Sequence, residues 1–493
     1  MESGVPGSLV GVSSHGHMQS ASRPFPATSA RYRRAVLFFA FAFAVIADPV
    51  SSVAYAIEAA LRALGGRLAL LVPTMSLVVA IIALVTANYW RLVRRFPAGG
   101  GDAEAVGRAF GTPFAFPAIG ALIVDFALTI AISIAAATSA IIAFVPALAS
   151  LRVPIALALL VGVAGLTWFG HGGRLVFALM TGVFVVAAGA VLAQGFLAPH
   201  GVGSVNPSHG HGRGPLLAIL FAFPVAMALA TGIEAASTAI AQLGQIDDHG
   251  RRRFGRGTLL LTVGIVGTLT IGLAVLAVRL HVGLPTRDST QVANLAHAAA
   301  GPGLLFGLFQ LSSALLLLAA ASSSFQAGPG LMKALARDRA AASGQGVLPV
   351  AFGRTNRHHT PYHAVLAYLA IAGTIVVAAG AHEQELVLFY AVAVFISFLS
   401  GLLAMARFAH QQGERTVIVL NTAAIAAVTF TLAVNVARGY PLVSLAATAL
   451  IALALYQLWN RAGRPADIET IERLTPADAR GEPMDPAPDA PSG

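Results

Sequence analysis

Twelve apolar segments, each about long enough to cross a bilayer, constrain the fold of this chain more than any other feature. A helix needs about 20 apolar residues to span the hydrocarbon core. Hydrophobic residues make up 57% of the 493 residues and charged residues only 11%. These values exclude a soluble enzyme and predict an all-α membrane protein. The predicted spans are residues 35–64, 68–90, 115–146, 153–170, 174–198, 215–243, 257–280, 303–325, 361–381, 385–408, 415–437 and 440–460.

Basic residues near the ends of these segments predict the orientation of the chain in the membrane. With the N-terminus inside, the outer segments hold 7 of the 31 Lys and Arg residues, and a basic loop over residues 247–253 lies inside. Because cytoplasmic loops are enriched in Lys and Arg, we expect a multi-pass protein of the inner (plasma) membrane with both termini in the cytoplasm. We predict a disordered arm over residues 1–30, a transmembrane domain over 31–460 and a disordered tail over 461–493.

The centre of the first apolar segment carries Asp48, Pro49, Ser51 and Ser52. An aspartate at the centre of a membrane helix costs roughly 2.5–3.5 kcal/mol, and proline lacks a backbone donor and disturbs the preceding turn. Interrupted helices occur at this depth only where they line a cavity or pack inside protein. We therefore predict a broken helix that borders a site. The alternative is a proline kink with Asp48 hydrogen-bonded to a neighbour.

The sixth segment is interrupted as well, at residues Thr231-Gly232-Ile233-Glu234. It lies five spans after the first, so the two segments enter the membrane from opposite sides. This offset is typical of an inverted repeat whose two broken helices meet at the midplane. The sequence therefore predicts two halves of five spans each (5+5), with the last two spans outside the repeat.

Polar side chains inside the apolar spans are the candidate binding residues. On the third span they recur every four positions, so they share one helix face. The candidates from the first, third and sixth spans are Asp48, Tyr55, Asp125, Thr129, Ser133, Thr231 and Glu234. The alternative for each is a structural hydrogen bond, most readily for the hydroxyls, because Ser and Thr often bond their own i−4 carbonyl.

These candidates form an oxygen-rich set of carboxylates, hydroxyls and carbonyls. Such a set suits a dehydrated alkali cation or a proton. Three intramembrane acids will not all stay ionised without a cation between them, since burial and mutual repulsion disfavour the charged forms. We expect one of the acids to exchange a proton near neutral pH, which would allow transport to be coupled to protons.

Four motifs carry a resemblance to a known family: Asp48-Pro-Val-Ser-Ser-Val-Ala-Tyr55, Phe96-Pro-Ala-Gly-Gly-Gly101, Asp125-Phe-Ala-Leu-Thr129 and Thr231-Gly-Ile-Glu234. They resemble the KimA-type, KUP-related potassium–proton symporters of the APC superfamily, over about spans 1–10. The resemblance implies a LeuT-type fold, proton-coupled potassium uptake, and a cation and proton path lined by the seven candidates. It also implies that Tyr390 lines this path.

We therefore predict a secondary active transporter in the lipid bilayer that takes up potassium with protons by alternating access. An amino-acid or amine permease of the same superfamily is the alternative. Free N–H groups at a glycine-containing break bind a carboxylate, and Gly232 supports that interpretation. The acid and proline of the first break favour a cation or an amine instead.

Other functions are less consistent with the sequence. A non-transporting membrane sensor or scaffold is the rival from another class, and it would tolerate loss of the three acids. No nucleophile–base pair or metal-ligand spacing occurs in the apolar spans, so we predict no enzyme, no cofactor and no resident metal. The net charge of +10 comes mostly from span ends and does not indicate a nucleic-acid partner. A homodimer is one oligomeric state left open.

Overall fold

The computed structural model describes residues 27–169, 174–203, 214–243, 246–336, 346–439 and 442–464. These residues form helices, 3₁₀ turns and loops, with no strand among them. The chain divides into two units, residues 1–38 and residues 39–493, and the second unit contains every helix after α1. The two predicted terminal segments, residues 1–30 and 461–493, lie largely outside the described residues.

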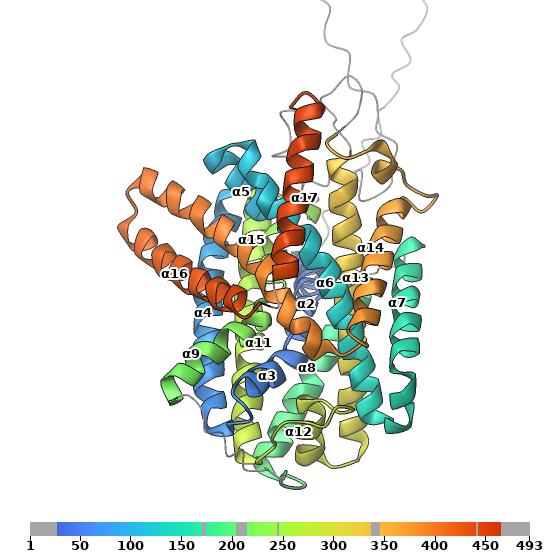
Figure 1. Ribbon diagram of the computed structural model, residues 1–493. Coiled ribbons are helices and arrows are strands. Elements are labelled where there is room, and N and C mark those ends of the chain that lie inside the picture. The colour runs from blue at the N-terminus through green and yellow to red at the C-terminus, as the bar shows by residue number, and fades with distance from the viewer. Residues whose placement is uncertain are drawn as a thin grey trace, which may run out of the picture. The chain divides into compact units, whose positions relative to one another are not determined.

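Ten helical stretches within the described ranges are long and apolar enough to cross a membrane, and two shorter apolar helices lie at residues 35–45 and 362–378. These twelve match the twelve predicted spans in order, so the prediction of an all-α membrane protein is confirmed. Figure 1 shows α5 and α17 at the upper end of the view and α12 at the lower end. The helices are α1 (Ala27–Val45), α2 (Ala47–Ser51), α3 (Val53–Ala63), α4 (Leu71–Arg95), α5 (Gly101–Phe110), α6 (Ala115–Phe144), α7 (Arg152–Trp168), α8 (Arg174–Leu197), α9 (Pro215–Ala226), α10 (Ala235–Ala239), α11 (Asp248–Arg279), α12 (Gln291–Ala300), α13 (Leu304–Leu335), α14 (Tyr362–Ala378), α15 (Glu383–Gln412), α16 (Arg415–Ala437) and α17 (Leu442–Arg461), with 3₁₀ turns η1 (Leu68–Leu70), η2 (Thr112–Phe114), η3 (Pro146–Leu151), η4 (Met227–Ala230), η5 (Ile240–Gln242) and η6 (Val350–Gly353).

Two predicted boundaries were wrong. The basic loop over residues 247–253 is mostly helical, because α11 already begins at Asp248 and Asp247 caps it by accepting a hydrogen bond from the Gly250 N–H (3.2 Å). α13 continues ten residues past the predicted end at residue 325. Hydrophobic length marks where a helix is apolar, and a capped helix can extend beyond that part. The short helices α5 and α12 were not predicted.

Helix α6 forms the centre of the second unit and is buried along most of its length. It packs against α13, α14, α15 and α17. Gly120 allows α17 to approach α6 closely, because a Cβ added there would lie 2.9 Å from the Thr448 carbonyl oxygen of α17. This packing holds the candidate residues of α6 inside the protein rather than against lipid.

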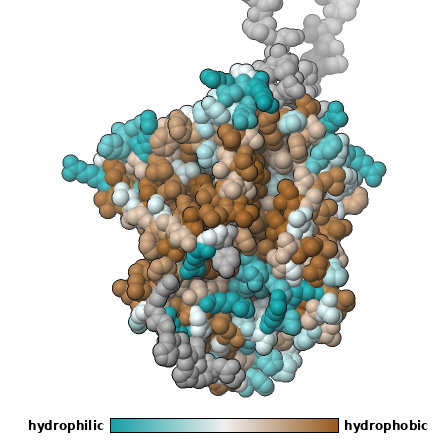
Figure 2. All heavy atoms as spheres, in the orientation of Figure 1, coloured by the Kyte–Doolittle hydropathy of each residue, from teal (hydrophilic) through white to brown (hydrophobic). Residues whose placement is uncertain are grey.

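The outer faces of the helices remain apolar. Val419 on α16 and Val443 and Leu450 on α17 are each 67% exposed. Figure 2 shows apolar side chains in brown across the middle of this face, and hydrophilic ones in teal at the turn between α15 and α16. Apolar side chains that face outward from a bundle of long helices are typical of a surface in contact with lipid.

Candidate functional site

The first interruption lies in the middle of the first span. Ile46 and Ser52 separate α1, α2 and α3, but both residues keep right-handed helical dihedral angles. The Ser51 hydroxyl donates to the Asp48 carbonyl (2.7 Å), and the Ser52 hydroxyl donates to the Pro49 carbonyl (2.7 Å). Proline has no N–H to donate to the carbonyl one turn before it, and the two serine hydroxyls add hydrogen bonds to carbonyls inside the kinked segment. The first span is therefore kinked and not unwound, but Asp48 Oδ1 has no hydrogen-bond donor among the described residues, unlike in the alternative interpretation.

The sixth span is interrupted more deeply. After α9 and η4, Thr231 has a ψ of 136° and Gly232 has a φ of +71°. The helix resumes at Ala235, where α10 begins. A positive φ of this kind is readily adopted only by glycine. The Thr231–Gly232 pair therefore unwinds the sixth span, as predicted.

The two interruptions contact each other. The Ser52 hydroxyl shares its one hydrogen between the Pro49 carbonyl and the Leu229 carbonyl of the sixth span, which lies at 3.1 Å. A Cβ added at Gly232 would lie 2.7 Å from Asp48 Oδ2 and 2.9 Å from Pro49 Cδ. Glycine therefore lets the Asp48 carboxylate lie directly against the unwound backbone. This is the meeting of the first and sixth spans that the inverted repeat requires.

Three carboxylates gather around this contact. Asp125 on α6 is 4% exposed and Glu234 is 7% exposed. Asp48 interacts electrostatically with Asp125, and Glu234 interacts with both. Asp48 Oδ1 and Glu234 Oε2 are buried and have no hydrogen-bond donor among the described residues. Buried carboxylate oxygens of this kind are unfavourable unless a cation or a proton binds them.

Hydroxyl groups border the carboxylates. The buried Tyr55 side chain on α3 lies within hydrogen-bonding reach of the Thr231 side chain. Thr129 and Ser133 are buried on α6, one and two turns beyond Asp125. The structure thus brings Asp48, Tyr55, Asp125, Thr231 and Glu234 together, with the other two on the adjoining part of α6. Tyr390 belongs to α15, and its side chain lies outside the described part of the chain.

A fourth carboxylate near the cluster was missed by sequence reasoning. Asp102 lies in the first turn of α5 and is only 3% exposed. Its Oδ2 accepts hydrogen bonds from the Tyr89 hydroxyl (2.5 Å) and the Ser397 hydroxyl (3.2 Å). It also interacts electrostatically with Glu234. The signal in the sequence was an acid directly after three glycines, a pattern that a solvent-exposed turn would also give.

A second polar network lies at the opposite end of α6 from α5. Glu58 on α3 is 1% exposed, forms an ion pair with Arg62 (2.8 Å) and interacts electrostatically with Glu383. Glu383 at the start of α15 accepts a hydrogen bond from the Ser139 hydroxyl (2.6 Å), to which Arg152 also donates (2.7 Å). Hydrogen bonds among Glu383, Ser139 and Arg152 thus connect the third, fourth and tenth spans at that end of the bundle, and Glu58 of the first span lies within electrostatic range of Glu383.

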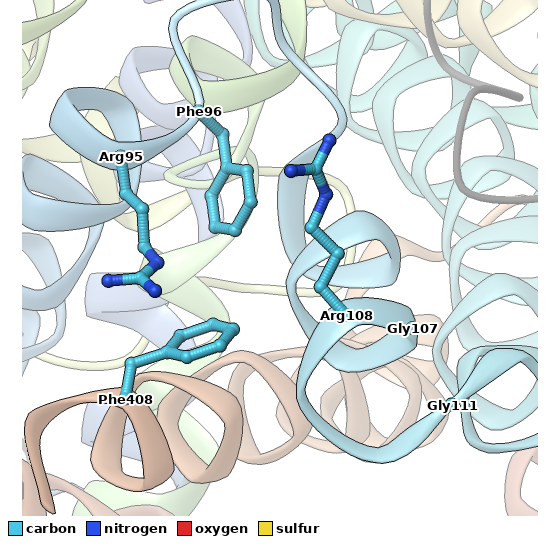
Figure 3. A pocket seen from close by; sticks show the side chains of 6 residues that line it. All are labelled: Arg95, Phe96, Gly107, Arg108, Gly111 and Phe408. Carbon is cyan, nitrogen blue, oxygen red and sulfur yellow. The ribbon is translucent and has the colours of Figure 1, made fainter. Parts of the chain in front are cut away.

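A cavity of about 700 Å³ opens at the other end, beside the C-terminal part of α5. Its lining includes Arg95, Phe96, Arg108 and Phe408. Figure 3 shows the two arginine side chains on either side of Phe96, with Phe408 opposite. The Arg95 guanidinium stacks on the Phe408 ring at 3.9 Å from its centre, and Arg108 forms an ion pair with Glu104 (2.7 Å). The cavity brings solvent close to α5.

Sequence comparisons place these features in context. Residues 37–459 match the family model described as amino acid permease. Over 363 residues the chain is 28% identical to the potassium transporter KimA of Bacillus subtilis (strain 168). The matched region covers 71% of this chain and 58% of that relative. The chain therefore spans less than two thirds of the length of this relative.

The solved structures that match this chain include those of the manganese transporter of Eremococcus coleocola. A mutant of that protein is 15% identical, with a TM-score of 0.48, and covers 91% of this chain and 97% of its own. Its complex with an aromatic bis-isothiourea substituted compound is 14% identical, with a TM-score of 0.44, and covers 88% and 97%. The fold assignment therefore depends on the family match and on the two interrupted spans that meet inside the bundle.

Proposed function

The chain belongs to the amino acid permease family, and from that premise we propose that it is a secondary active transporter that carries potassium into the cell with protons by alternating access. The observation that carries the proposal is the contact between the two interrupted spans. Asp48 lies against Gly232 there, and Asp125 and Glu234 lie within electrostatic range. Carriers of this architecture bind their cargo where broken helices meet at the midplane.

The buried oxygens at this contact favour a cation as cargo. Asp48 Oδ1 and Glu234 Oε2 have no donor among the described residues, and carboxylate oxygens are hard ligands suited to alkali cations. The name of the Bacillus subtilis relative supports potassium. The membrane potential would favour entry by about 2.3 kcal/mol per charge per 100 mV.

The backbone of the first span argues against an amino acid. The N–H groups of Val50, Ser52 and Tyr55 all donate to carbonyls within that span. They are therefore not available to bind the carboxylate of a substrate. A free amino acid would require such unbonded N–H groups. An amine or an amino acid remains the second candidate, favoured by the description of the family and by the unwound backbone at Gly232.

Proton coupling is proposed from the same three acids. One potassium ion balances only one of the charges of Asp48, Asp125 and Glu234. A proton on one of these acids lowers the remaining repulsion, because clustered buried carboxylates repel one another. Potassium and a proton would therefore bind together from outside and both leave on the cytoplasmic side before the empty carrier returns, which couples potassium entry to the inward proton gradient. Seven residues would line the path, namely Asp48, Tyr55, Asp125, Thr129, Ser133, Thr231 and Glu234, with Tyr390 as an eighth.

The location in the cell is also a proposal. The distribution of basic residues supports a multi-pass protein of the inner membrane with both termini in the cytoplasm. Under this topology the end of the bundle that carries α5 faces the cytoplasm, and the Glu58–Glu383 network faces outward. Residues 1–30 and 461–493 would form cytoplasmic arms on either side of a transporter domain over residues 31–460.

Uptake by proteoliposomes with an inward proton gradient tests the function. We expect accumulation of potassium and rubidium that requires the gradient, and little accumulation of sodium or of amino acids. The Asp48→Asn and Glu234→Gln variants should lose uptake by about tenfold or more, since each removes a charged ligand. Uptake of an amino acid or amine without rubidium flux would overturn potassium as the cargo.

A matched control separates the site from general effects of charge removal. Glu385 lies two residues after Glu383 in the first turn of α15, and it is exposed. The Glu385→Gln variant should retain uptake close to that of the unmodified protein. If it lost uptake as severely as Glu234→Gln, the losses would reflect net charge and not the site.

A further inference from the structure

Asp102 is a buried carboxylate outside the predicted binding site. The hydroxyl groups of Tyr89 and Ser397 both donate to the same oxygen, Oδ2, and the bond from Tyr89 is 2.5 Å long, at the short end of the range for hydroxyl–carboxylate bonds. Oδ1 has no donor among the described residues and lies against Gly401, where an added Cβ would sit 2.0 Å away. No cation pairs with Asp102 in the described part of the chain. An acid held in this way has a free position for a proton.

Tyr89 donates a hydrogen bond to Asp102 and lies within electrostatic range of the binding-site acids Glu234 and Asp125. It is fully buried on α4, and its ring packs edge-on against Phe398. Its hydroxyl interacts electrostatically with Asp102, Glu234 and Asp125. A tyrosine hydroxyl can donate and accept at the same time. Tyr89 therefore has the chemistry and the position to pass a proton between the Glu234 side and Asp102.

The turn that precedes Asp102 contacts the inner end of the sixth span. Gly99 has a φ of +92°, and an added Cβ would lie 2.6 Å from the Ala241 Cβ in η5. η5 follows α10, the helix that begins next to Glu234. Movement of this end of the sixth span would therefore change the packing over Asp102. The same α5 helix ends beside the 700 Å³ cavity, whose lining includes Arg108.

We propose that Tyr89 and Asp102 form the inner half of the proton path, through which the proton leaves Glu234 for the cytoplasmic side. Tyr89 gives its hydroxyl proton to Asp102 and takes up the proton released by Glu234, so it remains neutral. The net change is one proton moved from Glu234 to Asp102. Movement of η5 away from Gly99 then opens Asp102 to water, which takes the proton. The proposal rests on the proposed proton-coupled transport.

The surroundings of Asp102 support a group that changes its protonation. α5 is a short helix outside the candidate membrane spans, and burial raises the pKa of Asp102 to about 7, although the hydrogen bonds from Tyr89 and Ser397 lower it. Among the elements packed against α5, α4 contributes Tyr89, α15 contributes Ser397, α6 carries Asp125, and Glu234 directly precedes α10. On α5 itself, Glu104 is engaged by Arg108. No arginine is among the groups that change the pKa of Asp102.

Two transport modes in proteoliposomes separate a relay from a structural role. Net rubidium uptake driven by a proton gradient needs proton release, whereas exchange of rubidium for potassium at equal pH does not. For Asp102→Asn and Tyr89→Phe we expect driven uptake to fall by about tenfold or more, and exchange to stay within about twofold of the unmodified protein. Equal losses in both modes, or no loss in either, would overturn the proposal.

The control is Asp248→Asn, which removes an exposed aspartate from the first turn of α11 whose ion pair in the described part of the chain is with Arg251 (3.1 Å). It should leave both modes unchanged.

A second measurement does not depend on the cargo. A jump from about pH 6 to about pH 8 in purified protein should release about one proton fewer from Asp102→Asn than from the unmodified protein. Equal release would overturn the proposal, while absence of rubidium flux in the unmodified protein would instead refute potassium as the cargo.

Discussion

The first and sixth spans are both interrupted, but they are interrupted in different ways. The first keeps right-handed helical dihedral angles at Ile46 and Ser52. The sixth leaves the helix at Thr231 and Gly232, where φ becomes positive. A proline removes one donor and bends a helix, whereas a glycine with positive φ reverses the local path of the chain. The two halves of a repeat can therefore reach the same site with different backbones.

The two interruptions contribute different groups to the contact between the spans. The first span presents side chains, namely the Asp48 carboxylate and the Ser52 hydroxyl, toward the sixth. The sixth span presents backbone, at Gly232 and the Leu229 carbonyl. The contact is thus asymmetric, and substitutions on the two sides should have unequal effects. Since the sixth span has no room for a side chain at the contact, its disruption should be the more severe.

Gly232→Ala should have the largest effect. The new Cβ would overlap the Asp48 carboxylate, and a positive φ disfavours alanine by roughly 1–2 kcal/mol in addition. We expect rubidium uptake to fall by about tenfold or more, since 1.4 kcal/mol corresponds to a factor of ten. The control is Gly264→Ala on α11, where an added Cβ meets nothing within 4 Å. Normal uptake by Gly232→Ala would show that transport does not need the close contact.

Asp102, which follows the turn packed against the sixth span, allows a test of how stability depends on pH. Because the pKa of Asp102 is raised to about 7 from 3.8, the folded protein holds a proton there between about pH 4 and pH 7 that the unfolded protein has lost. Stability should therefore fall as pH rises through this window, by up to about 4 kcal/mol. Asp102→Asn should remove this part of the decline. Parallel melting curves for the two proteins from about pH 4.5 to 7.5 would contradict the expectation.

Pro49→Ala tests whether the kink of the first span serves transport. Restoring an N–H within the helix should stabilise the span by about 1–3 kcal/mol, because proline inside a helix is unfavourable by that order. We expect a higher melting temperature together with uptake reduced by about threefold, as a straighter span changes conformation less readily. Pro215→Ala is the control, since Pro215 lies at the first position of α9, where proline is tolerated. A rise in both stability and uptake would contradict this role.

The sequence was informative wherever the membrane made a residue exceptional. Apolar length identified all twelve spans, because the thickness of a bilayer sets a minimum for each. Asp48, Asp125 and Glu234 stood out because acids are rare within apolar runs. The end of α13 was missed because a helix can continue past its apolar part. The backbone at the first interruption could not be foreseen, since it depends on which carbonyls the two serine hydroxyls reach.

Asp102 shows where sequence reasoning failed. It follows three glycines in a polar stretch, where an acid usually faces solvent. It is buried because α5 packs against α15, and one of its partners, Ser397, lies 295 residues away in the chain. Burial caused by so distant a contact leaves no local pattern of hydrophobic residues. Glu58 and Glu383 were missed for the same reason, near the ends of apolar segments.

The smallest expected effect concerns the hydrogen bond that joins the two interruptions. Ser52→Ala removes the bond to the Leu229 carbonyl together with a bond within the first span, to the Pro49 carbonyl, whereas Ser51→Ala removes only a bond within that span, to the Asp48 carbonyl. A buried neutral hydrogen bond contributes about 0.5–1.5 kcal/mol, so Ser52→Ala should lower rubidium uptake by about two- to tenfold. Ser51→Ala should change it less. If the two variants lost uptake equally, the serines would serve the kink itself, and the contact between the spans would depend on Asp48 and Gly232 alone.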